Sequence, residues 1–225
     1  MITARTNPTL KLVRKLIAQK RKRDEFGLFV VEGEDLVGAA AAAGIEPIEL
    51  LVAGETVDEE LLAELSTLPH PARTIGVYRR ADLPRGERET TLALWRVGDP
   101  GNVGTLLRAA DAFGAAIALS PGCADPLGPK ALRASVGAIF RVSLVAWDDA
   151  PGERVALVAH GGTPLHELEL TGPTTFVLGA EWSGLPQEVV DTCGSTATIV
   201  TTGDAESLNV TVAGAIALYE RSRSY

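Results

Sequence analysis

The segment Glu206-Ser207-Leu208-Asn209-Val210-Thr211-Val212-Ala213, near the end of the chain, places polar residues directly before an apolar helical run. Ser207 can cap such a helix, and the Asn209 side chain offers hydrogen-bond donors and acceptors at its first turn. Taken alone, this is the pattern of an ordinary helix start. Two glycine-bearing segments, residues 99–104 and 178–185, precede it, and the three together predict a single ligand-binding cleft.

Strand-like and helix-like segments alternate from residue 91 to the C-terminus. Strands are expected at 91–96, 116–119, 140–146, 155–159, 175–178 and 197–200, and helices at 103–113, 130–136 and 210–221. This alternation predicts an α/β domain whose parallel sheet is covered on both faces.

The N-terminal part of the chain has its own, shorter alternation. Helices are expected at 8–20, 34–43 and 58–65, and strands at 26–32 and 48–52, which together predict a small α/β unit. Residues 79–89 are charged and contain Pro84 and Gly86, as a linker does. The expected domains are therefore residues 1–82 and 90–225.

Positive charge gathers at the N-terminus of an acidic protein. The net charge is −8, yet residues 1–25 hold eight Lys or Arg and only two acids. This segment is either a solvated basic helix or a contact for nucleic acid, because phosphates respond to local fields.

The cysteines and the hydrophobic segments of the sequence indicate the cellular compartment. Cys123 and Cys193 form no metal-type pair and suit a reducing compartment as free thiols. No signal peptide is evident, and the alanine run at 39–43 is too short to span a bilayer. We therefore expect a soluble cytoplasmic protein with no membrane contact.

Each of the two upstream segments follows an expected strand. In residues 99–104, Pro100 stiffens the loop, and Gly101 and Gly104 permit close approach of a ligand. These glycines do not make the dinucleotide fingerprint. Arg108, just inside the following helix, either emerges at an edge or occupies a site. In residues 178–185, Glu181 lies between two glycines, which is also the pattern of a plain strand-to-helix turn.

Over nearly its whole length the chain resembles the SpoU family of RNA 2′-O-ribose methyltransferases, part of the SPOUT group. Residues 99–115, with Asn102 and Arg108, resemble the family's first motif; residues 179–185 resemble the second and 199–220 the third. Residues 130–137, with Arg133, resemble the segment after the first motif. The N-terminal stretch resembles the substrate-binding domain often fused to this catalytic domain.

The resemblance implies a trefoil-knotted α/β domain that forms a homodimer and binds S-adenosylmethionine, beside a ribosomal-protein-like N-terminal domain. It implies methylation of a ribose 2′-hydroxyl in structured RNA. The additional RNA domain favours ribosomal RNA over transfer RNA. No metal is required, because the sulfonium of the donor already carries an activated methyl group.

The resemblance also implies roles for particular residues. Arg108 is the leading candidate for activating the 2′-hydroxyl; because a guanidinium stays protonated, we expect it to grip a substrate phosphate and act electrostatically. The other expected catalytic residues are Asn102, Glu181, Ser207 and Asn209. The expected donor-binding residues are Gly179, Gly184, Leu185, Ile199 and Leu208. The expected RNA contacts are Lys20, Arg21, Lys22, Arg23 and Arg133. The histidines, His70, His160 and His166, lie outside the three motifs and are interpreted as structural or surface residues.

Two departures from the family pattern affect the donor pocket. Val200 and Thr201 replace the Pro-Met pair that commonly follows Ile199, and Trp182 stands where the family usually has glycine. Two other functions therefore stay open. One is an RNA-binding protein of the same fold that has lost turnover. The other is a nucleotide-dependent oxidoreductase, whose glycine fingerprint is missing.

Overall fold

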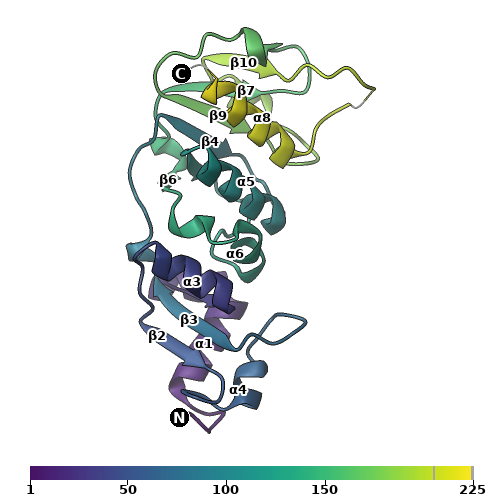
Figure 1. The fold of residues 1–225 in the computed structure, drawn as a ribbon. Coiled ribbons are helices and arrows are strands. Elements are labelled where there is room, and N and C mark those ends of the chain that lie inside the picture. The colour runs from purple at the N-terminus through teal and green to yellow at the C-terminus, as the bar shows by residue number, and fades with distance from the viewer. Residues whose placement is uncertain (205, 224–225) are drawn as a thin grey trace. The chain divides into compact units, whose positions relative to one another are not determined.

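The structure is a computed structural model, and it describes residues 1–204 and 206–223 (Figure 1). The chain forms two compact units: Met1–Leu83 with Asp125–Arg141, and Pro84–Ala124 with Val142–Tyr225. The sequence assigned residues 125–141 to the second domain, whereas they pack with the first unit. Phe140 explains this, because its ring lies 5.7 Å from that of Tyr78 and 6.3 Å from that of Phe29.

The first unit contains a small antiparallel sheet. Its strands are β1 (Leu28–Glu32), β2 (Glu49–Val52) and β3 (Thr74–Arg79), in the order β1-β3-β2. Its helices are α1 (Pro8–Ala18), α2 (Lys20–Phe26), α3 (Glu34–Ala42), α4 (Glu59–Ala63) and α6 (Pro129–Ser135), with 3₁₀ turns η1 (Arg80–Asp82) and η2 (Ala138–Phe140). The central strand, β3, was not predicted from the sequence.

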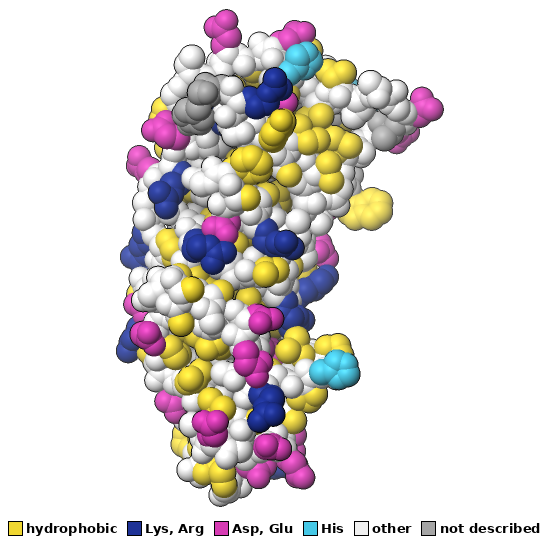
Figure 2. Space-filling model, in the orientation of Figure 1, with side chains coloured by type: hydrophobic (Ala, Val, Ile, Leu, Met, Phe, Trp, Pro, Cys, Tyr) yellow, Lys and Arg dark blue, Asp and Glu magenta, His cyan; other side chains and the backbone are white. Residues whose placement is uncertain are grey.

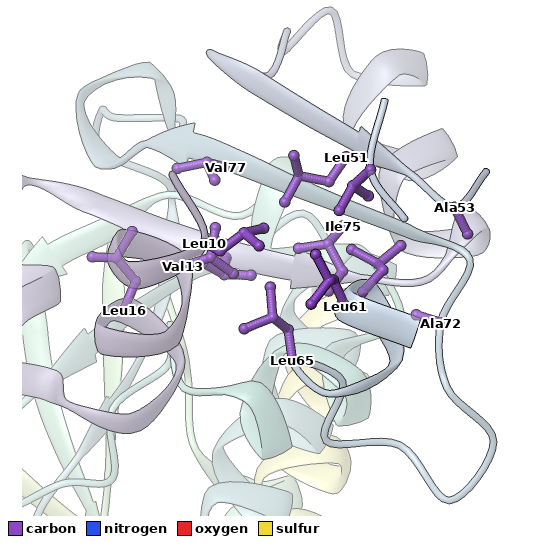
Figure 3. Packing of buried hydrophobic residues seen from close by; sticks show 13 residues of the cluster. Leu10, Val13, Leu16, Leu51, Ala53, Leu61, Leu65, Ala72, Ile75 and Val77 are labelled. Carbon is purple, nitrogen blue, oxygen red and sulfur yellow. The ribbon is translucent and has the colours of Figure 1, made fainter. Parts of the chain in front are cut away.

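Helix α1 supplies one side of the core of this unit. Asn7 caps it by accepting a hydrogen bond from the Thr9 N–H at 2.8 Å, and Pro8 occupies its first turn. Leu10, Val13 and Leu16 are buried among side chains of the sheet (Figure 3). Each fully buried side chain of this kind contributes roughly 1.5–3 kcal/mol. The opposite face of α1 is left for its polar residues.

The helix predicted over residues 8–20 is interrupted. Gln19 adopts an extended conformation with φ −130°, which separates α1 from α2. Gly27 then ends α2 in the left-handed conformation with φ 62°. As a result Phe26, which the sequence placed in a strand, belongs to α2.

The second unit is built on a seven-stranded sheet in which every pair is parallel. The strands are β4 (Thr90–Leu94), β5 (Ala116–Leu119), β6 (Leu144–Ala146), β7 (Glu153–Leu157), β8 (Thr163–Pro164), β9 (Thr174–Leu178) and β10 (Ser195–Thr198). Their order is β6-β5-β4-β9-β7-β10-β8. The parallel sheet expected from the sequence is confirmed. The strand expected at 140–146 is shorter, because residues 138–140 form η2.

The helices of this unit are α5 (Pro100–Ala112), α7 (Gln187–Val190) and α8 (Val210–Ser222), and its 3₁₀ turns are η3 (Trp147–Asp149) and η4 (Leu165–Glu167). Gly214 allows α8 to pack closely on α5, because a Cβ there would lie 2.6 Å from Leu106 Cδ2. The other face of the sheet carries a second cluster, in which Val189 of α7 packs on Ala93 and Val177. None of the described helices is long and apolar enough to cross a membrane.

Candidate active site

One cavity of about 490 Å³ opens at the carboxyl ends of neighbouring strands in the second unit. Its lining comes from the segments after β7, β9 and β10 together with the start of α8. Ligands of parallel sheets bind at this edge, because the loops of adjacent strands meet there. Six of the expected catalytic and donor-binding residues line it: Gly179, Glu181, Gly184, Ile199, Ser207 and Leu208. The tertiary structure thus brings the second and third motifs together.

The turn after β9 depends on its two glycines. The Gly184 N–H donates to the Ala180 carbonyl at 2.9 Å, and Gly184 has φ +62°. A Cβ on Gly179 would lie 2.1 Å from the carbonyl carbon of Gly184, so no side chain fits there. Close packing of the backbone therefore shapes the cavity wall at this turn.

The first motif joins the cavity through a carboxylate. Asp99 caps α5 by accepting a hydrogen bond from the Asn102 N–H at 3.0 Å. The Asn102 side-chain amide donates to Glu181 Oε1 at 2.8 Å. Partial burial alone would raise the pKa of Glu181, but hydrogen bonds from Asn102 and from backbone N–H groups outweigh it and lower that pKa. The cavity wall therefore carries a carboxylate at neutral pH.

The residue that caps α8 differs from the one expected from the sequence, which was Ser207. Asn209 is the N-cap and accepts a hydrogen bond from the Thr211 N–H at 2.8 Å. Ser207 instead faces the cavity, whereas Asn209 is not part of its lining. The sequence could not separate the two, because both residue types are good helix caps.

Three other predicted site residues are not among the described residues that line the cavity: Asn102, which bonds to its wall, Leu185 and Arg108. Leu185 packs with the Val189 cluster beneath α7, so it supports the turn from behind. Arg108 is exposed on α5, six residues after Asn102, which places it about 240° around the helix and about 9 Å along it. Arg108 therefore does not converge with Asn102 and Glu181 in one copy of the chain.

His160, which the sequence analysis interpreted as structural or surface, lines the cavity. It follows β7, whose carboxyl end lies at the same edge as those of β9 and β10. His160 could have been identified from the sequence, because it follows an expected strand and ligands bind at the carboxyl ends of parallel strands.

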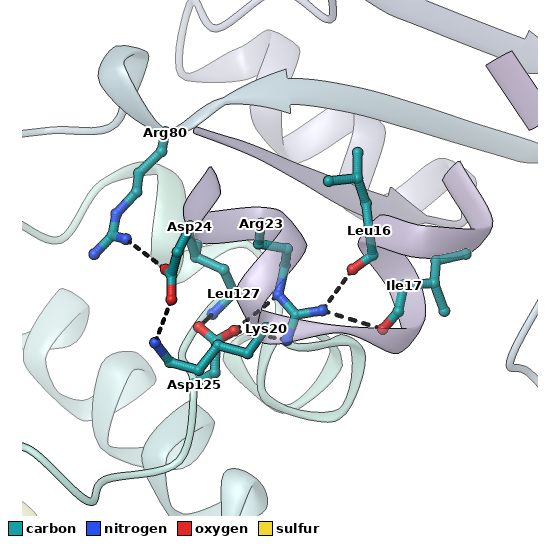
Figure 4. Close-up of polar contacts among 8 residues, drawn as sticks. All are labelled: Leu16, Ile17, Lys20, Arg23, Asp24, Arg80, Asp125 and Leu127. Carbon is teal, nitrogen blue, oxygen red and sulfur yellow. Dashed lines mark hydrogen bonds and ion pairs between the residues drawn. The ribbon is translucent and has the colours of Figure 1, made fainter. Parts of the chain in front are cut away.

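Arg23, predicted to contact RNA, is buried in the first unit with 7% of its surface exposed. Its Nε donates to Asp125 Oδ2 at 2.8 Å, and its Nη1 donates to the carbonyls of Leu16 and Ile17 (Figure 4). The assignment of Arg23 to RNA binding is therefore corrected: its guanidinium joins α2 to α1 and to the segment that begins at Asp125.

The other predicted RNA contacts are distributed more widely. Lys20 pairs with Asp24 at 2.7 Å and Lys22 with Glu25 at 2.8 Å, while Arg21 is exposed. Arg133 Nη1 donates to Thr67 Oγ1 at 2.8 Å within the first unit. Three further cations, Lys11, Arg14 and Lys15, occupy the exposed face of α1. The sequence analysis counted these three in the basic segment without naming them as contacts.

Comparison with known proteins agrees with this arrangement. Residues 89–219 match the SpoU rRNA Methylase family, which is more than half of the chain. The chain belongs to the SpoU rRNA methylase family. Residues 7–80 match the MRM3-like substrate binding domain.

Relatives of this SpoU methylase extend over both units. It is 30% identical to the 23S rRNA (uridine(2479)-2′-O)-methyltransferase of Streptomyces viridochromogenes, covering 99% of this chain and 91% of the relative. It is 28% identical to the 23S rRNA (guanosine(2553)-2′-O)-methyltransferase RlmP of Bacillus subtilis, covering 91% and 92%. The crystal structure of an AdoMet-bound rRNA methyltransferase from Sinorhizobium meliloti superimposes with a TM-score of 0.85 at 31% identity, covering 99% of this chain and 97% of that chain.

The cavity of this SpoU methylase suits S-adenosylmethionine in size and charge. Its volume falls within the roughly 300–1,000 Å³ of small-molecule sites. Leu178, Ile199 and Leu208 offer apolar walls for an adenine ring. Two carboxylates, Glu181 and Glu206, line it, and none of the described lining residues is Lys or Arg. A donor that carries a sulfonium and an ammonium group fits such a lining.

Proposed function

We propose that this chain transfers a methyl group from S-adenosylmethionine to a ribose 2′-hydroxyl of structured RNA, and that the RNA is ribosomal. The observation that carries the proposal is the single acidic cavity formed by the second and third motifs, with Asn102 of the first motif bonded to its wall. Relatives that span both units are named as 23S rRNA 2′-O-methyltransferases.

The donor supplies an activated methyl group, so the protein residues position the acceptor and exclude water. In this proposal Asn102 and Glu181 hold the wall of the donor site, and Ser207 orients groups at its mouth. Arg108 holds a phosphate of the substrate and stabilises the developing alkoxide electrostatically. A guanidinium remains protonated, which suits this role better than that of a general base.

A second copy of the chain is part of the proposal. Phe113 is exposed directly after α5 (39%), and α8 exposes Val212 (45%) and Tyr219 (54%). Hydrophobic side chains gather over α8 in Figure 2. Exposed apolar patches of this kind mark association surfaces. Because Arg108 lies on α5 away from the cavity of its own copy, we propose that it serves the cavity of the partner.

Mixed dimers test this arrangement. Arg108→Ala removes the guanidinium, and Leu208→Trp fills the cavity; each homodimer should lose most turnover. When the two variants are co-expressed, about half of the dimers are mixed and each mixed dimer has one complete site, so the mixture should regain roughly a quarter of wild-type activity. If the mixture stays as inactive as its parents, Arg108 does not act across the dimer.

The units have separate tasks in this proposal. Residues 1–82 bind the RNA, and residues 90–225 carry the catalytic, trefoil-knotted domain. The family matches at residues 7–80 and 89–219 support this division. An enzyme that modifies ribosomal RNA works where ribosomes assemble, so a cytoplasmic location belongs to the proposal.

The decisive experiment incubates the purified protein with methyl-labelled S-adenosylmethionine and an unmodified 23S rRNA transcript. We expect one ribose per transcript to gain a 2′-O-methyl group, mapped by resistance of the adjacent bond to alkaline hydrolysis. A 16S rRNA transcript and a transfer RNA pool serve as controls. Binding of the RNA without donor binding by calorimetry would instead support the catalytically silent alternative.

A further inference from the structure

Trp182 lies at the mouth of the cavity with its whole surface accessible. Its exposed fraction is 101%, whereas the other two tryptophans, Trp95 and Trp147, are half-buried and pack on each other with ring centroids 5.3 Å apart. Tryptophan is a large apolar residue that folded proteins bury for most of its area. A fully exposed ring beside a binding cavity indicates a contact made only with a ligand or partner.

The backbone on either side of Trp182 forms a closed turn. Trp182 lies between Ala180 and Gly184, which pair through an isolated bridge. The close packing of Gly179 on Gly184 closes the turn at its base. The hydrogen bond from Asn102 anchors the preceding residue, Glu181. A short, closed turn of this kind limits the ring to rotation about its own side-chain bonds.

The negative charge next to Trp182 favours an uncharged group as its contact. Residues 180–185 contain Glu181 and neither Lys nor Arg, so this turn repels a phosphate. The face of a nucleobase carries no net charge, and aromatic side chains bind unpaired bases by stacking on that face.

We propose that Trp182 stacks on an unpaired base of the RNA substrate at the mouth of the cavity. This inference rests on the proposed function and assigns a substrate-binding residue to it. Stacking on one base positions the nucleotide at the cavity mouth without adding a charge contact. Trp182 therefore governs RNA affinity, while the basic face of the first unit governs its dependence on salt.

The test compares Trp182→Ala, Trp182→Phe and Ser183→Ala in methylation of the unmodified 23S rRNA transcript. Loss of a stacked base should raise the KM for RNA roughly 5- to 100-fold in Trp182→Ala. Trp182→Phe should retain most of the affinity, since it keeps an aromatic face. Ser183→Ala is the matched control, because Ser183 is exposed on the same turn and is not among the described residues that line the cavity.

Measurements of donor affinity, of the salt dependence of RNA binding and of the oligomeric state exclude other roles for the ring. The Kd for S-adenosylmethionine, measured by calorimetry, should stay within about twofold of wild type in Trp182→Ala. The slope of log affinity against log salt should also stay unchanged. A parallel fall in donor affinity would make Trp182 a cover for the donor, and dissociation of a dimer would make it a partner contact; either outcome overturns the proposal.

Fluorescence tests stacking without turnover. Short single-stranded oligouridylate and oligoadenylate should quench the tryptophan emission of the wild-type protein and not that of Trp182→Phe. Equal quenching in both proteins, or an unchanged KM in Trp182→Ala, overturns the inference while leaving the methyltransferase proposal intact. Absence of methylation by the wild-type protein would instead contradict the proposed function itself.

Discussion

The side-chain amide of Asn102 donates a hydrogen bond to Glu181 Oε1 at 2.8 Å and so joins the start of α5 to the turn after β9. The two residues are 79 positions apart in the sequence. Glu181 also accepts a longer contact from the Asp99 N–H, at 3.4 Å. This carboxylate therefore connects the first motif of the family to the second.

Removing the Asn102 amide should loosen the cavity wall. We expect Asn102→Ala to weaken S-adenosylmethionine binding about 3- to 10-fold, consistent with loss of about 1 kcal/mol for a half-exposed hydrogen bond. Calorimetry measures the effect. Thr105→Ala is the control, because its hydroxyl bonds only to the Gly101 carbonyl within α5. Equal losses in both variants would attribute the effect to helix stability.

The lowered pKa of Glu181 predicts an acid dependence of stability. A carboxyl group that ionises more readily when folded stabilises the protein above its unfolded pKa, about 4.3. That contribution is lost as the pH falls through the lower pKa of the folded state. Thermal unfolding of Glu181→Gln should therefore differ from wild type most at neutral pH, and the two curves should converge in acid. If the difference in stability between the two proteins stayed constant down to pH 3, the hydrogen bonds to Glu181 would not be the cause of its lowered pKa.

Arg23 should matter for folding. Arg23→Ala leaves Asp125 with little compensation inside the first unit, and removing one partner of a buried ion pair costs about 3–5 kcal/mol. Arg21→Ala, two residues earlier at an exposed position of the same helix, should change stability by less than about 0.5 kcal/mol. Urea unfolding followed by circular dichroism compares the two. Similar stability of both variants would contradict the buried role of Arg23.

The exposed face of α1 should carry the salt dependence of RNA binding. In the part of the chain that the structure describes, no ion pair involves Arg14 or Lys15. Changing both to Gln should reduce the slope of log affinity against log salt by roughly 1 to 2, if each holds one phosphate. Arg85→Gln with Arg88→Gln removes the same net charge from the linker. An equal effect of both pairs would indicate a non-specific response to net charge.

Tyr78 should make the protein sensitive to alkali. Its side chain is fully buried, its hydroxyl has no hydrogen-bond partner among the described residues, and burial raises its pKa to about 12. Above the unfolded pKa of about 10, only the unfolded chain releases this proton, so stability should fall by about 1 kcal/mol by pH 11. Tyr78→Phe should lose this fall and be no less stable at pH 7, since it removes an unpaired hydroxyl. Unfolding at pH 7, 9 and 11 checks both expectations.

Local pattern was enough to predict most of the second unit. Buried parallel strands form continuous apolar runs in the sequence. The capping residues Asp99 and Asn209 mark where α5 and α8 begin. Most of the residues that line the cavity were expected because residues 179–185 and 199–220 resemble two motifs of the family. β3 was missed, because Gly76 interrupts its apolar pattern and its central place in the sheet depends on pairing with β1 and β2.

The sequence by itself determined the fold class and the family to which the protein belongs, because these depend on local periodicity and on short motifs. Only the tertiary structure decided that Arg23 is buried, that residues 125–141 pack with the first unit, and that Arg108 lies apart from Asn102 and Glu181. The first two depend on contacts between residues distant in the chain, Arg23 with Asp125 and Tyr78 with Phe140. The third depends on the contact of Asn102 with Glu181, which places the cavity wall beside one face of α5. No local pattern encodes which distant partner a buried charge or aromatic ring will meet.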